Sequence, residues 1–155
     1  MADSLTARIA RIRSQTVGDI PRRSARRRPD KTAIIDGEVN LTFADLDDRV
    51  NRVVAALWDN GFRKGDRIAL LSHNCWQYAV LAFATARAGV VLVPINFMLG
   101  PDEIGYILGH SGVTGLIVED TLAAVASEAM ARDGHVDTKV VITAAGVPSP
   151  AGWHD

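Results

Sequence analysis

Among the side chains that could act as nucleophiles, general bases or metal ligands, this 155-residue sequence has one cysteine and four histidines. Metal binding requires several ligands that the fold brings together, and these histidines stand far apart, without the spacing of a ligand motif. The cysteine lies at the start of a predicted buried helix, where we expect it to be inert. We therefore assign no metal ligand among these candidates, which are Cys75, His73, His110, His135 and His154.

Phosphate binding would require a glycine-rich turn from a strand into a helix, where backbone N–H groups can close on the anion. The one glycine cluster runs from Gly109 to Gly115 and leads from a predicted helix into a predicted strand. This polarity is wrong for a phosphate at a helix N-terminus and predicts a helix stop. A Walker sequence, a Gly-x-Ser-x-Gly elbow and a plausible Ser, His and Asp set are also absent. We therefore predict no catalytic and no cofactor-binding residue.

Composition favours one compact domain, since 48% of the residues are hydrophobic and 23% are charged. A lone cysteine excludes a disulfide framework and favours a reducing compartment. No apolar run approaches the ~20 residues that span a bilayer. These features together predict a soluble, cytoplasmic protein.

A central stretch of the sequence predicts a strand, a helix and a second strand. Residues 68–71 and 90–93 are short apolar runs, typical of strands buried on both faces of a parallel sheet. Parallel neighbours need a crossover, and residues 75–89 supply a slim helical one. Asn74 is the predicted N-cap of this helix and Gly89 its left-handed end.

Strands and helices also alternate on both sides of this unit. Residues 32–42 predict a β-hairpin that turns at Asp36-Gly37, and Thr42 with Asp45 predicts a capped amphipathic helix that ends at Asn60. Further on, the pattern predicts a helix from Pro101, a strand at 116–118, a helix at 121–130 and a strand at 140–142. We interpret the charged outer face of the first long helix as solvated, not as a catalytic pair of acids; it carries Asp45, Asp47, Asp48, Arg49 and Arg52.

The first 28 residues carry eight arginines against Asp3 and Asp19, so the rest of the chain is acidic. One interpretation is a transit peptide or an arm that lies on anionic lipid, with peripheral membrane contact. We favour the other, a helix that starts at Ile20-Pro21, exposes its arginines to water and stops before Pro29. Nucleic-acid binding is not predicted, because no aromatic residue lies among these arginines.

Five short matches in order give the chain a resemblance to a known family, the adenylate-forming, AMP-binding synthetases that include acyl-CoA synthetases. Residues 41–46 look like the family's Tyr-x-Glu-Leu helix, and residues 64–69 are similar to its Lys-Gly-Asp-Arg-Val-Ala. Asn74, Ala88-Gly89 and residues 93–96 are similar to its Asn, Ala-Gly and Val-Pro-Leu-Asn series, and residues 103–108 complete the order. Phe43 and Gln77 depart from the family's usual aromatic and glutamate, in roles of packing and capping.

The resemblance implies an α/β fold with a mainly parallel sheet flanked by helices and an N-terminal β-hairpin, as in the N-terminal subdomain of such synthetases. It also implies a parent enzyme that uses ATP, Mg2+ and coenzyme A to convert a carboxylic acid through an acyl-adenylate to a thioester. For the acid, we expect a medium- or long-chain fatty acid first and an aryl acid second. The phosphate loop and the catalytic lysine of the family have no counterpart here, so the resemblance implies no cofactor in this chain itself.

We accordingly expect three parts: a basic arm at 1–15, the α/β subdomain at 16–143, and a linker or truncated end at 144–155. The expected partner is the remainder of a synthetase chain, and we expect this chain alone to be inactive. Apolar surface left bare by missing elements would favour a homo-oligomer. The alternative function is a stand-alone α/β interaction module without enzymatic activity.

Overall fold

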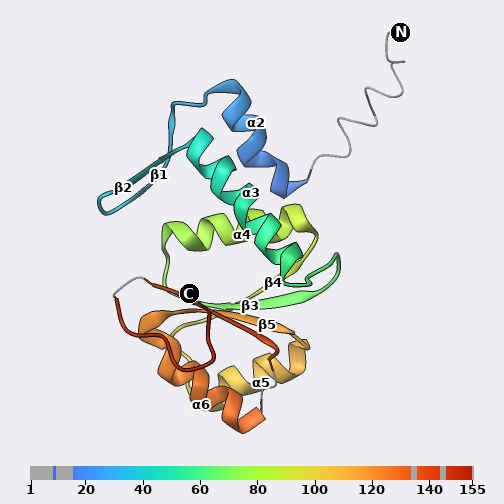
Figure 1. The fold of residues 1–155 in the computed structure, drawn as a ribbon, viewed down its shortest axis with the longest axis vertical. Coiled ribbons are helices and arrows are strands. Elements are labelled where there is room, and N and C mark those ends of the chain that lie inside the picture. Colours follow the sequence, from blue (N-terminus) through green and yellow to red (C-terminus); the bar gives the residue numbers. More distant parts are fainter. Residues whose placement is uncertain (1–8, 10–15, 134–135, 144–145, 155) are drawn as a thin grey trace.

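The computed structural model describes residues 9, 16–133, 136–143 and 146–154 (Figure 1). The predicted basic arm and His135 therefore lie outside the described residues, apart from Ile9. The short 3-10 helices are η1 and η2, and the elements run as follows: η1 Val17–Asp19, α2 Ile20–Arg27, β1 Thr32–Asp36, β2 Val39–Thr42, α3 Phe43–Asp59, β3 Arg67–Leu71, α4 Trp76–Ala88, β4 Val91–Ile95, α5 Pro101–Ser111, β5 Gly115–Glu119, η2 Asp120–Leu122, α6 Ala123–Asp133 and β6 Thr138–Ile142.

A parallel sheet with the strand order β4-β3-β5-β6 forms the centre of the molecule. Helices α3 and α4 lie on one side of it and α5 and α6 on the other, while β1 and β2 form a separate antiparallel hairpin (Figure 1). The predicted α/β fold is confirmed. No helix in the described ranges combines the length and the apolar character that a bilayer crossing requires.

Strand β3 divides the interior into two cores because its side chains alternate between the two faces of the sheet. Ile68 and Leu70 pack with α3 and α4, whereas Ala69 and Leu71 pack with α5 and α6. All four are buried, as the unbroken apolar run predicted.

The expectation that residues 90–93 form a strand buried on both faces is wrong. Strand β4 lies at the edge of the sheet, and the Val91 side chain is 48% exposed. Pro94 fits this position, because an edge strand tolerates a residue that cannot donate a backbone hydrogen bond.

The predicted cap of α3 is confirmed, and the predicted cap of α4 is not. Thr42 and Asp45 form a reciprocal capping box, with the Asp45 N–H 3.2 Å from the Thr42 hydroxyl and the Thr42 N–H 2.9 Å from the carboxylate. At α4 the N-cap residue is Cys75, not Asn74, and its side chain makes no cap hydrogen bond. Gly89 does end that helix in the left-handed conformation, with φ +77°.

The hairpin turns one residue later than the Asp-Gly pair suggested. Asp36 is still part of β1 and pairs with Val39, so the turn consists of Gly37 and Glu38. Only Gly37 needs a positive φ, which is +54°. The Asp36 side chain is thereby left free for a contact outside the hairpin.

The described part of the C-terminal segment lies along the outer edge of β6. The Val141 N–H donates to the His154 carbonyl over 2.7 Å, and the His154 N–H donates to the Lys139 carbonyl over 2.9 Å. Trp153 packs against the core under α5 and α6. Residues 146–154 are therefore attached to the subdomain by backbone hydrogen bonds and by apolar contact.

Candidate functional site

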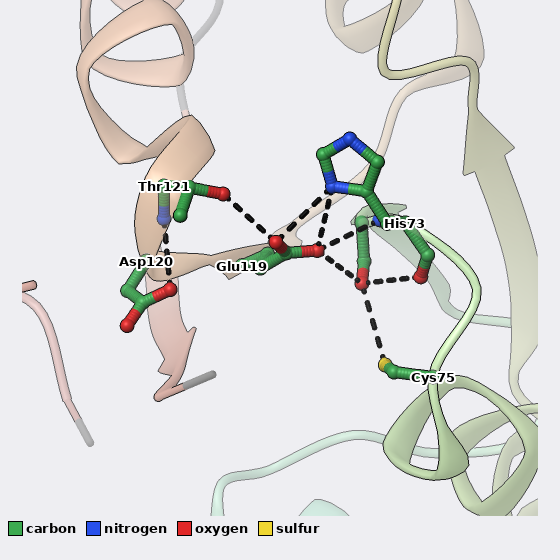
Figure 2. Close-up of polar contacts among 6 residues, drawn as sticks. His73, Cys75, Glu119, Asp120 and Thr121 are labelled. Carbon is green, nitrogen blue, oxygen red and sulfur yellow. Dashed lines mark hydrogen bonds and ion pairs between the residues drawn. The ribbon is translucent and has the colours of Figure 1, made fainter. Parts of the chain in front are cut away.

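Polar side chains converge where β3 and β5 end, at the carboxyl edge of the parallel sheet. Leu71 and Val118 are register partners, so the residues that follow them lie side by side: Ser72-His73 in the loop after β3, and Glu119 as the last residue of β5. In open α/β sheets this edge is where ligands usually bind. Figure 2 shows the resulting cluster, in which the Glu119 carboxylate stands between His73 and Thr121.

The Glu119 carboxylate accepts hydrogen bonds from three residues on two loops. From the β3 side come the His73 backbone N–H at 2.8 Å and the Ser72 hydroxyl at 3.2 Å. From its own side comes the Thr121 hydroxyl at 2.8 Å. The side chain is only 10% exposed, so these donors replace the water that it gives up.

Two opposing effects act on the charge of Glu119. Burial raises the pKa of the carboxyl, while the hydrogen bonds from the His73 N–H, the Thr121 hydroxyl and the His73 ring lower it, as does the charge of His73. The lowering effects win, and the pKa of Glu119 lies below the usual glutamate range. Glu119 is therefore an anion at neutral pH.

The His73 ring is held by this anion and remains half exposed. Its Nδ1 lies 3.1 and 3.0 Å from the two carboxylate oxygens, and its side chain is 47% exposed. The ring also packs against Phe97, with 4.1 Å between ring centroids. The carboxylate thus orients the ring through Nδ1, and Figure 2 shows the other ring nitrogen on the side away from Glu119.

The other members of the cluster are tied to the backbone. The Asp120 carboxylate, which is buried, accepts the Thr121 N–H at 2.9 Å and the Val147 N–H at 3.1 Å. The Cys75 thiol lies 3.6 Å from the Ser72 hydroxyl. Asp120 therefore holds the C-terminal segment in place, and among the described residues the Cys75 thiol has a hydrogen-bond contact with the Ser72 hydroxyl and none with a base that would activate it as a nucleophile.

The sequence pattern indicated no site residue, and His73 stands isolated from the other histidines along the chain. The signal that could have drawn attention to the pair is positional: His73 and Glu119 come at the ends of two apolar runs that become neighbouring parallel strands. Of the other histidines, His110 stacks on Tyr106 at 5.3 Å and His154 lies beside β6. The glycine cluster is a helix stop, with Gly112 as the left-handed cap of α5.

The interpretation of Asp47 as a solvated surface acid is wrong. Its carboxylate lies 2.7 Å from the Arg87 guanidinium, and the two side chains are 18% and 13% exposed. Arg87 also donates to the Asn51 side chain at 2.5 Å and to the Gly18 carbonyl at 2.9 Å. This ion pair joins α3, α4 and η1, and it is structural.

Comparison with known proteins gives one family. The model of the AMP-binding enzyme family matches residues 21–154. A feruloyl-CoA synthase from Amycolatopsis is 40% identical over 125 residues, which are 78% of this chain and 26% of that protein. A medium/long-chain-fatty-acid–CoA and 3-oxocholest-4-en-26-oate–CoA ligase from Mycobacterium tuberculosis is 31% identical over 114 residues, 74% of this chain and 21% of that protein.

A solved structure shows the same fold. The anthranilate CoA ligase AuaEII, crystallised with anthranoyl-AMP, superposes with a TM-score of 0.84 at 26% identity. The superposition covers 91% of this chain and 27% of that protein. The chain thus spans about a quarter of the length of these relatives. On the family match and these likenesses, the chain belongs to the AMP-binding enzyme family.

Proposed function

We propose that this chain is the N-terminal subdomain of an AMP-forming acid–CoA ligase. The observation that carries the proposal is the family match over residues 21–154, together with relatives that are named as CoA ligases and CoA synthases. In such a ligase the carboxylate is first joined to AMP, which creates a leaving group that a thiol can displace.

Membership of the family implies the use of ATP, and we propose Mg2+ and coenzyme A as the further reactants of the parent enzyme. The described residues do not fit a nucleotide phosphate or a metal ion. The turn from β3 into α4 is Ser-His-Asn-Cys, without a glycine, and the described ranges contain no group of three or more acidic, histidine or cysteine side chains placed to hold a metal. We therefore assign no step of the reaction to a residue of this chain.

We propose that the chain forms a wall beside the acyl site and holds the loops at the carboxyl edge of its own sheet in place. The Glu119 carboxylate connects the loops after β3 and β5, since it accepts hydrogen bonds from both. Among the relatives, identity is higher to the feruloyl-CoA synthase than to the fatty-acid ligase. This difference makes aryl acids the first class to test, with medium- and long-chain fatty acids second.

We also propose a cytoplasmic location and a homo-oligomer. The location is supported by the single free cysteine, Cys75, which suits a reducing compartment. Oligomerisation is supported by an open apolar groove of about 380 Å3 between α3, α4 and the face of β5 and β6.

The test is an assay of the whole reading frame to which these residues belong. We expect ATP–pyrophosphate exchange that depends on an added carboxylic acid, and thioester formation when coenzyme A is present. The 155-residue chain assayed in parallel should give neither. Protein-dependent exchange by the short chain would contradict the proposal that the catalytic steps belong to the rest of the reading frame.

The alternative is a stand-alone α/β interaction module with the same sheet. It would be favoured if the reading frame, expressed as encoded, gave no exchange with aryl or fatty acids and contained no Ser/Thr/Gly-rich phosphate loop downstream. Such a result would leave the fold and the family unchanged, because both rest on residues 21–154.

A further inference from the structure

Helix α2 presents arginines to solvent that have no acidic partner in the described part of the chain. Arg23, Arg26 and Arg27 are exposed, and so is Arg28 directly after the helix. The ion pairs among the described residues include none of these four, and of the α2 arginines only Arg22 is paired, with Asp19. The helix therefore carries a cluster of uncompensated positive charge.

The arginines occupy one face of the helix because the opposite face is packed. Pro21 is buried, and Ser24 and Ala25 are half-buried. Arg23 and Arg27 are four residues apart, a spacing at which like charges repel and weaken a helix. Arginines in the last turn of a helix interact favourably with its dipole. This effect does not explain Arg23, which lies nearer the start of α2. Repulsion between these arginines therefore destabilises the helix, and an anion bound to them would remove that repulsion.

Positive charge gathers on α2 itself, which carries four arginines, whereas the hairpin and the first half of α3 beside it also carry the acids Asp36, Glu38, Asp45, Asp47 and Asp48. Helix α2 lies at one end of the long axis of the molecule, and α5 and α6 lie at the other (Figure 1). The region from α5 to β6 is acidic: its cations are Arg132 and Lys139, and its acids are Asp102, Glu103, Glu119, Asp120, Glu128, Asp133 and Asp137. A negatively charged plane would attract the α2 end and repel the other, so the molecule would approach it in one orientation.

Exposed apolar side chains stand at the first residue of α2 and in η1 just before it. Val17, in η1, is 61% exposed and Ile20, the first residue of α2, is 46% exposed. A soluble acidic partner would bind the arginines without needing exposed apolar side chains. A single-stranded nucleic acid is not favoured either, because no aromatic side chain stands among the arginines to stack on its bases. Basic residues combined with exposed apolar ones are typical of a surface that lies in the headgroup region of a bilayer.

We propose that the α2 end of this protein docks on an anionic lipid bilayer. Arg23, Arg26 and Arg27 contact the headgroup phosphates, and Val17 and Ile20 enter the boundary between headgroups and acyl chains. The favoured prediction of a helix from Ile20 is correct except that it ends at Arg27, one residue early, and the surface of that helix is the proposed contact. The proposal does not depend on the ligase assignment.

The test is co-sedimentation of the chain with vesicles of phosphatidylcholine alone and with vesicles in which about a third of the lipid is phosphatidylglycerol. We expect binding only to the anionic vesicles at ~0.1 M salt, and its loss at ~0.5 M salt, where charges are screened within a few Å. The triple variant Arg23→Gln, Arg26→Gln, Arg27→Gln should bind at least about tenfold more weakly. The pair Val17→Ser and Ile20→Ser should weaken binding while the salt dependence persists.

A matched control removes the same charge elsewhere. The triple variant Arg52→Gln, Lys64→Gln, Lys139→Gln should bind within about twofold of the unmodified chain, because none of these side chains belongs to α2. Circular dichroism verifies that each variant is folded. Equal binding to neutral vesicles, unchanged binding by the α2 triple variant, or tighter binding to a labelled single-stranded oligonucleotide than to anionic vesicles at the same salt would each overturn the proposal.

Discussion

The Asp36 carboxylate, at the end of β1, accepts a hydrogen bond from the backbone N–H of Trp76 over 2.9 Å. Trp76 is the first residue of α4, and its N–H has no partner within its own helix. A side chain from the hairpin therefore takes the place of the missing N-cap side chain, and it fastens the hairpin to the helix that crosses the sheet.

We predict that Asp36→Ala lowers the free energy of unfolding by about 1 kcal/mol, the usual effect of losing an N-cap acceptor. Asp36→Asn keeps an oxygen at this position and should lose less than half as much. Urea unfolding at neutral pH measures both. If alanine and asparagine have the same effect, the contribution of Asp36 comes from its place in the hairpin and not from the bond to Trp76.

The pair of Asp47 and Arg87 gives a second prediction. Because both side chains are largely buried, removing one leaves the other charged and poorly solvated. Asp47→Ala or Arg87→Met should each lower the free energy of unfolding by about 2 kcal/mol, and the double variant by less than the sum.

The matched control is the pair of Arg52 and Asp48 on the same helix, whose side chains are 69% and 65% exposed. Arg52→Gln should change stability by less than about 0.5 kcal/mol. Additive effects of Asp47→Ala and Arg87→Met in the double-mutant cycle would contradict a direct interaction between the two side chains.

These contacts show which parts of the structure the sequence could predict. The α3 cap was predictable because Thr42 and Asp45 are three residues apart, and the end of α4 because Gly89 marks it locally. The contacts of Asp36 with Trp76 and of Asp47 with Arg87 each span 40 residues, and that of His73 with Glu119 spans 46. Helical and strand periodicity carries no information about such pairs.

The order of the strands was also beyond the sequence pattern. A run such as residues 90–93 has the composition of a central strand, yet β4 lies at the edge, and only the pairing of β3 with β5 determines this. The same pairing brings His73 to Glu119. The candidate site depends on the order of the strands, so it could not be predicted until that order was known.

Glu119 gives a prediction for pH. Its pKa is lower in the folded state, so the unfolded chain binds the proton first as the solution is acidified. The stabilisation by Glu119 is therefore complete above the ordinary glutamate pKa of about 4.3 and is lost as the pH falls from there through the lower folded value. The unmodified chain should lose more stability than Glu119→Gln across this range.

Urea midpoints measured in steps from neutral pH to about pH 3 provide the comparison. Asp19 and Asp45 also have lowered pKa values, and since both are present in the two proteins their contributions cancel in the difference. Parallel curves for the unmodified chain and Glu119→Gln would mean that the hydrogen bonds from His73 and Thr121 do not hold the Glu119 charge.

The last prediction concerns the apolar groove between the helices α3 and α4 and the sheet face of β5 and β6. Its lining includes Val53, Leu57, Trp76, Val80, Val140 and Ile142. Apolar surface left in water costs about 25 cal/mol per Å2, so a second copy that covers the whole groove would gain about 3 kcal/mol from it. We expect the chain to self-associate at micromolar concentration and to bind a hydrophobic dye.

Val53→Lys places a charge in that groove, whereas Val147→Lys adds the same charge on the C-terminal segment, outside the lining residues. Val53→Lys should therefore shift the sedimentation profile toward the monomer and weaken dye binding, and Val147→Lys should leave both unchanged. A monomer that binds no dye would show that the groove needs no cover. If the two lysines have equal effects, the added net charge and not its position is the cause. The contact between copies would then lie outside the groove.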